Sequence, residues 1–248
     1  MQKTILFLLL TLSISSFAQQ GTTKKEGGLF NKANGILKKA TNGGGSALSN
    51  DEIIAGLKEA LSVGANNSSQ KLAAVDGFFA NAAIKVLMPE EAKKVESTLR
   101  SAGMGSMVDK AILSMNRAAE EASKSAAPIF LDAIKGMSFQ DALSILKGAD
   151  TAATGYLRGK TSGALTTAFK PVIDAALEKT NATKYWKDVF ETYNKLPTTF
   201  KKVNTDLSGY VTDKALGGLF YQVALEEQKI RKDPAARVTD VLKKVFAN

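Results

Sequence analysis

The sequence of 248 residues contains no histidine and no cysteine. Without these residues the chain cannot build a Ser-His-Asp or Cys-His catalytic centre, nor a zinc or haem site on His or Cys ligands. It also cannot form disulfides, so its fold must be stabilised by a hydrophobic core. We therefore predict no metal site and no cofactor, and the residue types favour a non-enzymatic protein.

Aromatic residues are scarce, at 7% of the chain, and the excess of basic residues is concentrated near the N-terminus. Of 33 Lys and Arg against 24 Asp and Glu, the first 46 residues hold Lys3, five further lysines and Glu26, which leaves 27 basic against 23 acidic residues in the rest. Nucleic-acid-binding domains usually carry a clustered basic face and stacking aromatics. We expect no nucleic-acid partner, and leave open an envelope protein or a lipid.

Residues 1–18 have the pattern of a secretory signal peptide. Lys3 precedes an apolar run from Ile5 to Leu12, and small residues lead to Ala18, after which we expect cleavage. A membrane anchor is the weaker interpretation, because the apolar run is shorter than the roughly 20 residues that a spanning helix needs. We expect a periplasmic or secreted protein that is not transmembrane once the signal is removed.

Residues 19–46 are rich in glycine and lysine, which predicts a flexible basic tether. Within it, the apolar residues of the segment 29–40 recur at helical spacing. This segment is either a short amphipathic helix on an anionic membrane surface, or a marginal helix that docks on the body or stays disordered.

Residues 47–248 predict a single all-α domain, a bundle of about seven to nine helices, because apolar residues recur at helical spacing and no convincing alternating strand is present. One helix after about residue 106 has a narrow seam of small residues, including Ala119 and Ala122, on which a neighbouring helix can pack closely. Pro128 predicts that this helix kinks or restarts.

Polar residues and glycines mark the expected helix ends. Four segments have helix-start residues: Ser138 with Asp141 in a capping box, Asp150 or Thr151, Asp206, and Asp233. Residues 64–67 are expected to interrupt the first helix, and a short extended segment at 84–88 is conceivable. Gly155, Gly159 and Gly163 lie four residues apart, which permits close helix contact or equally marks a weak helix.

Two groups of polar residues interrupt otherwise apolar helical faces. Glu227 falls in the middle of an apolar arc, with Arg231 and Arg237 as available partners, and Asn116 with Glu120 forms a second polar group. One interpretation is a buried ion-pair and amide network that fixes how helices pack, and we favour it. The other is that Asn116, Glu120, Glu227 and Arg231 line one pocket for a polar ligand.

Several ordered blocks carry a resemblance to a known family. They include MNRAAE from Met115 to Glu120, ILKG from Ile145 to Gly148, and DPAAR from Asp233 to Arg237. With these blocks, roughly residues 47 to 246 resemble the exported bacterial family catalogued as domain of unknown function 4197. The resemblance implies a helical exported domain and supplies no activity.

Three functions therefore stay open at the level of sequence. The first is a non-enzymatic binding or interaction module at the cell envelope. The second is a hydrolase or lyase that uses Glu120 and Glu227 as acid and base, which requires the two carboxyl groups to converge in a cleft. The third is a lipid or apolar-ligand carrier, which requires a cavity of several hundred Å³ with an apolar lining.

Overall fold

A computed structural model describes residues 49–195, 202, 205–233, 237 and 243. The predicted all-α class is confirmed, because these residues form helices and connecting segments and no strand. The predicted signal peptide, the tether and its segment 29–40 lie outside the described residues. The described helices are α2 Asn50–Ala73, the 3₁₀ helix η1 Glu90–Ala92, α3 Lys93–Ser101, α4 Gly105–Ser123, α5 Ala126–Lys135, α6 Phe139–Lys147, α7 Ala152–Glu178, α8 Ala182–Asn194 and α9 Leu207–Lys232.

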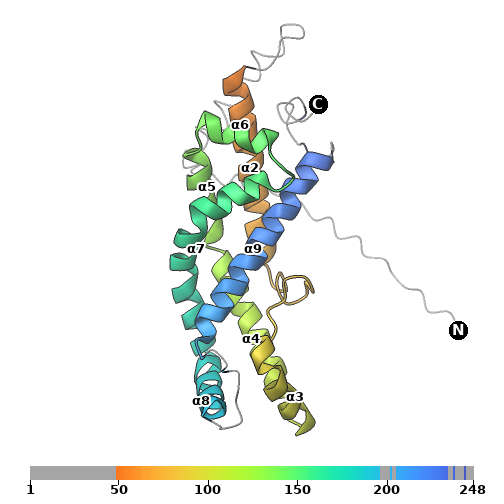
Figure 1. Cartoon of the computed structure of the whole chain (residues 1–248), viewed down its shortest axis with the longest axis vertical. Coiled ribbons are helices and arrows are strands. Elements are labelled where there is room, and N and C mark those ends of the chain that lie inside the picture. Colours follow the sequence, from red (N-terminus) through yellow and green to blue (C-terminus); the bar gives the residue numbers. More distant parts are fainter. Residues whose placement is uncertain (1–48, 196–201, 203–204, 234–236, 238–242, 244–248) are drawn as a thin grey trace, which may run out of the picture. The chain divides into compact units, whose positions relative to one another are not determined.

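Helices α4, α7 and α9 pack against one another, and α2 packs on α9, α5 and α4 (Figure 1). Their buried faces meet in one core, in which the rings of Phe130 and Phe220 lie edge to face with centroids 5.9 Å apart. Helices α3 and α8 lie at the same end of α4 and α7, opposite the end at which α2 begins (Figure 1). The positions of α3 and α8 matter for the site described below.

Helix α4 has the predicted seam of small residues. Ala118, Ala119 and Ala122 are fully buried, which lets α4 pack closely on its neighbours. The predicted restart is also confirmed, although α4 ends at Ser123, five residues before the proline. Pro128 is the third residue of α5, where its missing N–H would have had no partner within the helix.

The predicted interruption of the first helix at residues 64–67 is wrong, because α2 continues without a break from Asn50 to Ala73. Gly64 faces α9, where a Cβ on it would meet the Glu226 Cβ at 3.7 Å, an ordinary van der Waals contact, so the packing leaves room for a methyl group here. The hydroxyls of Ser68 and Ser69 donate to carbonyl oxygens four residues earlier at 2.7 and 2.8 Å, so these buried polar groups are satisfied within the helix.

Polar side chains cap α6 and α9 at the positions that the sequence indicates. Ser138 and Asp141 form a capping box at α6, and the hydrogen bonds from Ser138 lower the pKa of Asp141. Asp206 accepts a hydrogen bond from Gly209 N at 2.8 Å at the start of α9. Asp233 ends α9, and the helix that it was predicted to start falls mostly outside the described residues.

Of the two residues predicted to start α7, Asp150 does not cap it. The N-cap residue of α7 is Thr151, whose own side chain makes no capping hydrogen bond. Asp150 instead pairs with the Lys232 Nζ at 2.8 Å, and this lysine lowers the pKa of Asp150. A residue of α9 takes over the capping of α7, as described below.

The three glycines of α7 do not contact another helix. A Cβ added to Gly155, Gly159 or Gly163 would meet nothing within 4 Å, and all three residues are exposed. Of the two interpretations of the glycine spacing, this geometry supports a weak helix and not a close contact between helices.

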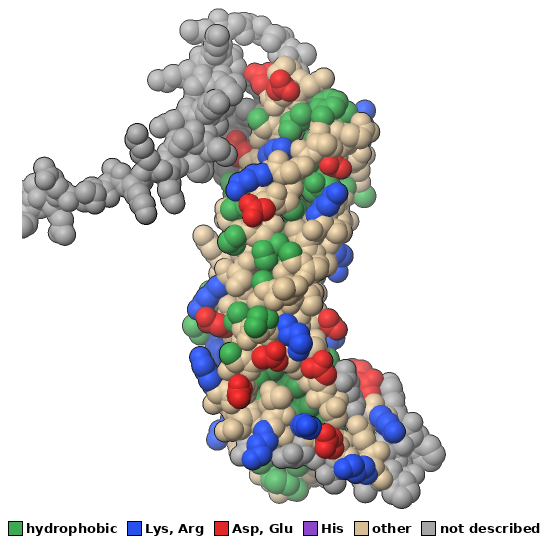
Figure 2. Space-filling model, turned by 90° about the vertical axis from the view of Figure 1, so that its left-hand side faces the viewer, with side chains coloured by type: hydrophobic (Ala, Val, Ile, Leu, Met, Phe, Trp, Pro, Cys, Tyr) green, Lys and Arg blue, Asp and Glu red, His purple; other side chains and the backbone are tan. Residues whose placement is uncertain are grey.

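The region around α7 forms the face shown in Figure 2, on which acidic and basic side chains are interspersed and hydrophobic ones form small groups.

We expect each of the substitutions Gly155→Ala and Gly159→Ala to raise the free energy of unfolding by about 0.5–1 kcal/mol, because alanine restricts the unfolded chain and fits an exposed helix. Chemical denaturation would measure the change. Gly148→Ala is the matched control and should destabilise, because its Cβ would lie 2.5 Å from the Ala152 Cβ and 2.8 Å from the Ser144 carbonyl oxygen. Loss of stability in the α7 variants would mean that these positions need glycine.

Candidate functional site

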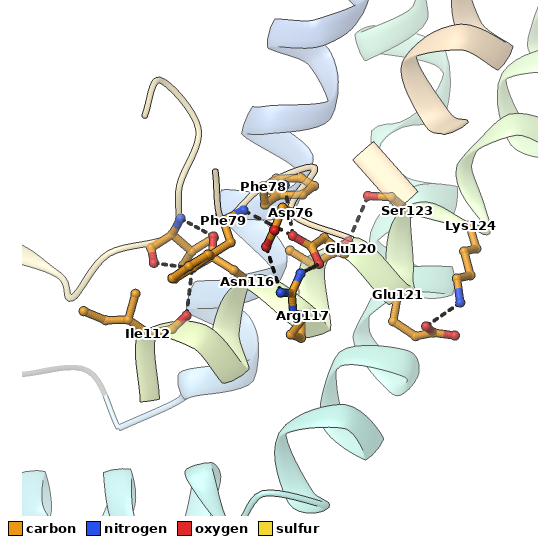
Figure 3. Close-up of polar contacts among 12 residues, drawn as sticks. Asp76, Phe78, Phe79, Ile112, Asn116, Arg117, Glu120, Glu121, Ser123 and Lys124 are labelled. Carbon is orange, nitrogen blue, oxygen red and sulfur yellow. Dashed lines mark hydrogen bonds and ion pairs between the residues drawn. The ribbon is translucent and has the colours of Figure 1, made fainter. Parts of the chain in front are cut away.

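Three polar residues of α4, which we call the α4 polar cluster, hold the connection between α2 and η1: Asn116, Arg117 and Glu120 (Figure 3). The Glu120 carboxylate is 4% exposed and accepts hydrogen bonds from Phe78 N at 3.1 Å and Phe79 N at 3.2 Å. Its other oxygen accepts from Arg117 at 2.6 Å. The Glu120 carboxylate therefore bonds to two backbone N–H groups and to a neighbouring arginine, all of them contacts that hold the fold.

The Asn116 amide binds both backbone polar groups of one residue, Val86. Its Oδ1 accepts from Val86 N at 2.9 Å, and its Nδ2 donates to the carbonyl oxygens of Val86 at 2.8 Å and Ile112 at 2.7 Å (Figure 3). Asn116 is fully buried. The Asn116 side chain therefore gives Val86 the hydrogen bonds that a neighbouring strand would otherwise give. Residues 84–88 are held on α4 in this way and do not form a strand.

The side chain of Phe78 explains why this connection is held so firmly. Phe78 is fully buried and reaches α9 at Gly218, where an added Cβ would lie 2.5 Å from the Phe78 ring. Arg117 also pairs with Asp76, whose φ of 67° lies in the left-handed region. The α4 polar cluster thus fixes a turn that places an aromatic ring against α9.

Tyr210 makes a further contact to this connection, since its hydroxyl donates to the Leu87 carbonyl oxygen at 2.7 Å. Burial, assisted by Glu91 and Glu90, raises the pKa of Tyr210 from 10.0 to about 12. Between these values the unfolded chain loses the proton while the folded chain keeps it, so stability must fall as the pH rises through this range.

We expect the wild-type protein to lose about 1 kcal/mol more stability than the Tyr210→Phe variant between pH 9.5 and 11.5, after allowance for the partial exposure of the tyrosine. Unfolding free energies measured across this range would test the difference. The comparison removes the contributions of other groups that titrate in both proteins. Parallel curves for the two proteins would contradict a raised Tyr210 pKa.

The second polar group surrounds Glu227, which is 7% exposed and caps a different helix. One carboxylate oxygen accepts from Ala153 N at 2.9 Å, and the other accepts from Thr154 N and the Thr154 hydroxyl, both at 2.8 Å. Ala153 and Thr154 belong to the first turn of α7, whose N–H groups lack helical partners and favour a negative charge. Glu227 is thus the N-terminal cap of α7.

Two arginines complete this arrangement. Arg231 donates to Glu227 at 3.0 and 2.9 Å and to the Ile145 carbonyl oxygen near the end of α6 at 2.8 Å. Arg237 donates to the carbonyl oxygens of Ile230 and Arg231 in the last turn of α9, at 3.1 and 2.8 Å. The group therefore joins the ends of α6, α7 and α9.

The hypothesis that Asn116, Glu120, Glu227 and Arg231 line one pocket has no support in the structure. Glu120 binds the backbone of Phe78, whose ring lies at Gly218, and Glu227 follows nine residues later, about 13 Å along α9. The two carboxylates share no partner. Asn116 and Glu120 attach a connection, and Glu227 and Arg231 join helix ends, as in the structural interpretation that we favoured.

A cavity of about 530 Å³ lies at the other end of the bundle, between η1, α3, α4 and α8. We call it the α3–α4–α8 groove, and its lining is mostly apolar. It reaches the surface, because Met107 is 53% and Leu113 36% exposed. The large apolar side chains that line it include Met88, Leu99, Met107, Leu113, Trp186 and Phe190.

Sequence reasoning did not identify this groove. Trp186 and Phe190 are 5% and 4% exposed, with ring centroids 4.5 Å apart, so both belong to the buried core. They are nevertheless also part of the groove wall. The feature of the sequence that could have indicated the groove is the pair Met104 and Met107 at the start of α4, since neither methionine lies on the buried face of this helix. Exposed methionines are common on adaptable binding surfaces.

Two further features concern the described part of the chain only. Within it, no cluster of three or more acidic residues could hold a metal ion. None of the helices described is long and apolar enough to cross a membrane.

Comparison with known protein families gives a match over most of the chain. The model of a family described as "Protein of unknown function (DUF4197)" matches residues 47–247. No curated protein matches the chain. No solved structure matches it either.

Proposed function

Because the chain belongs to the DUF4197 family of proteins of unknown function, its role has to be inferred from its own surface, and we propose that it is a non-enzymatic binding module. The observation that carries this proposal is the α3–α4–α8 groove, with its apolar lining and exposed Met107 and Leu113. Its volume of about 530 Å³ falls in the range typical of small-molecule sites. The groove binds an apolar ligand or the apolar part of one.

The two carboxylates no longer support the hydrolase or lyase alternative. A general acid or base must reach the proton that it transfers. Glu120 and Glu227 are 4% and 7% exposed, and the four carboxylate oxygens accept hydrogen bonds from backbone N–H groups, Thr154, Arg117 and Arg231. Using either carboxylate in catalysis would remove a contact on which the fold depends.

The place of action in this proposal is the cell envelope or the medium, and the pattern of residues 1–18 supports it. Intact mass measurement of the protein recovered from the envelope and from the medium would test it. A mass that corresponds to a chain beginning at Gln19 supports export and cleavage. Recovery of the uncleaved chain from the cytoplasm alone contradicts both.

Binding can be measured with the neutral apolar probe N-phenyl-1-naphthylamine. Trp186 lines the groove and is the single tryptophan of the chain, so its fluorescence reports on this site specifically. We expect Met107→Glu to weaken probe binding about tenfold, because it places a charge on the apolar wall. The matched control is Leu225→Glu on α9, which makes the same change at an exposed residue, 39% exposed, outside the groove.

The proposal fails if the probe leaves Trp186 fluorescence unchanged, or if both glutamate variants bind it as tightly as the wild-type protein. Circular dichroism of each variant would establish that its helices are intact. Because Met107 is largely exposed, the substitution should not disturb the core.

A further inference from the structure

A row of polar side chains on α4 forms one edge of the α3–α4–α8 groove. Ser106, Lys110 and Ser114 lie four residues apart and all line the groove. Residues at this spacing stack on one side of a helix, so the row extends about 12 Å along α4. Two hydroxyl groups therefore flank one ammonium group beside an apolar wall.

One of the two charged residues that line the groove, Lys110, has no partner in the described part of the chain. Glu96, the acidic residue of the lining, pairs with Arg100 at 2.9 Å, and Arg100 also pairs with Asp109 at 2.8 Å. Lys110 makes no ion pair or hydrogen bond with any part of the chain that the structure describes. Lys110 is therefore the charged group of the lining with which an anionic ligand can pair.

We propose that the groove binds a single-chain amphiphile with an anionic head, such as a fatty acid, whose head lies at Lys110 and whose chain lies along Leu99, Trp186 and Phe190. This inference rests on the proposed binding function and assigns the chemical class of its ligand. Lys110 supplies the charge, and the hydroxyls of Ser106 and Ser114 supply donors for the oxygens of a carboxylate or phosphate. The apolar walls take the hydrocarbon chain, whose burial drives association.

Three probes with the same chain length separate the head from the chain: dodecanoate, dodecanol and dodecyltrimethylammonium. Each would be titrated into the whole chain below its micelle concentration, with Trp186 fluorescence as the readout. We expect dodecanoate to bind about fivefold more tightly than dodecanol, as for a solvent-exposed charge pair, and the cation to bind most weakly. Added salt should reduce this preference, because it screens exposed charges.

Substitution of Lys110 assigns the preference to one residue. Lys110→Gln should make dodecanoate and dodecanol bind equally, and Lys110→Glu should make the cation the tightest of the three. Lys71→Gln removes the same charge from an exposed position on α2 and should leave the preference intact. Both lysines are exposed, so neither substitution should prevent folding.

The possible outcomes distinguish this inference from the function on which it rests. If all three probes bind equally and Lys110→Gln changes nothing, the anionic head is overturned while the apolar site stands. If the preference for dodecanoate survives in Lys110→Gln, the assignment to Lys110 is overturned. If no probe changes Trp186 fluorescence, both the ligand class and the binding function are overturned.

Discussion

Replacing Glu227 by glutamine is expected to lower the free energy of unfolding by about 3 kcal/mol. Glutamine has nearly the same shape, but its amide nitrogen must replace an oxygen that now accepts hydrogen bonds. If the amide nitrogen takes the place of the oxygen nearest Thr154, it faces the Thr154 N–H, which now donates at 2.8 Å. Two hydrogen-bond donors then face each other, and neither finds an acceptor there. The change also leaves Arg231, whose side chain is 12% exposed, without the charge that balances it. Urea denaturation would measure the loss.

Glu226→Gln is the matched control on the same helix. Glu226 is half-buried and accepts a hydrogen bond from Gln222 at 3.3 Å, so we expect a change within about 0.5 kcal/mol. In a double variant with Arg231→Gln, the losses should be less than additive, because the two residues interact directly. Equal stabilities of Glu227→Gln and Glu226→Gln would mean that Glu227 does not cap α7.

Replacing Asn116 by aspartate should destabilise the protein by a further large amount, about 3–5 kcal/mol at neutral pH. The substitution changes one amide nitrogen to oxygen and keeps the shape. It nevertheless places a carboxylate oxygen against the carbonyl oxygens of Val86 and Ile112, which now accept from Nδ2 at 2.8 and 2.7 Å. Thermal and urea unfolding would give the size of the effect.

The pH dependence of this variant provides a second test. A protonated aspartate can donate one hydrogen bond, so the deficit of Asn116→Asp relative to the wild-type protein should shrink as the pH falls. Asn81→Asp is the control, because the Asn81 side-chain oxygen accepts from Ala83 N at 3.1 Å and an aspartate can do the same. A small, pH-independent loss at residue 116 would argue against its role in holding Val86.

The helices could be predicted because their signals are local. The small-residue seam of α4 and the capping box at Ser138 depend on residues within a few turns of each other. For the same reason, the polar anomalies at Asn116, Glu120 and Glu227 could be recognised, and so could Arg231 as the partner of Glu227, four residues away. Each of these features follows from helical spacing alone.

The partners of the buried polar residues could not be predicted in this way. Glu120 and Asn116 bind backbone N–H groups 42 and 30 residues earlier, and any residue type offers such a group. Glu227 binds the start of α7, 73 residues before it at Thr154. This contact also explains why Asp150 does not cap α7, since the acceptor for the first turn of α7 comes from α9. The groove depends on how α3, α4 and α8 meet, which no single helical pattern contains.

Because α9 supplies both the acceptor for the first turn of α7 and the surface that receives Phe78, neither of these earlier regions can reach its final state without residues 207–232. A nascent chain that still lacks α9 therefore leaves apolar surface uncovered on α2, α4 and α7, whose faces α9 covers in the finished fold. Folding is thus expected to be completed only after synthesis is nearly finished, and a chain truncated before residue 207 should be prone to aggregation and proteolysis.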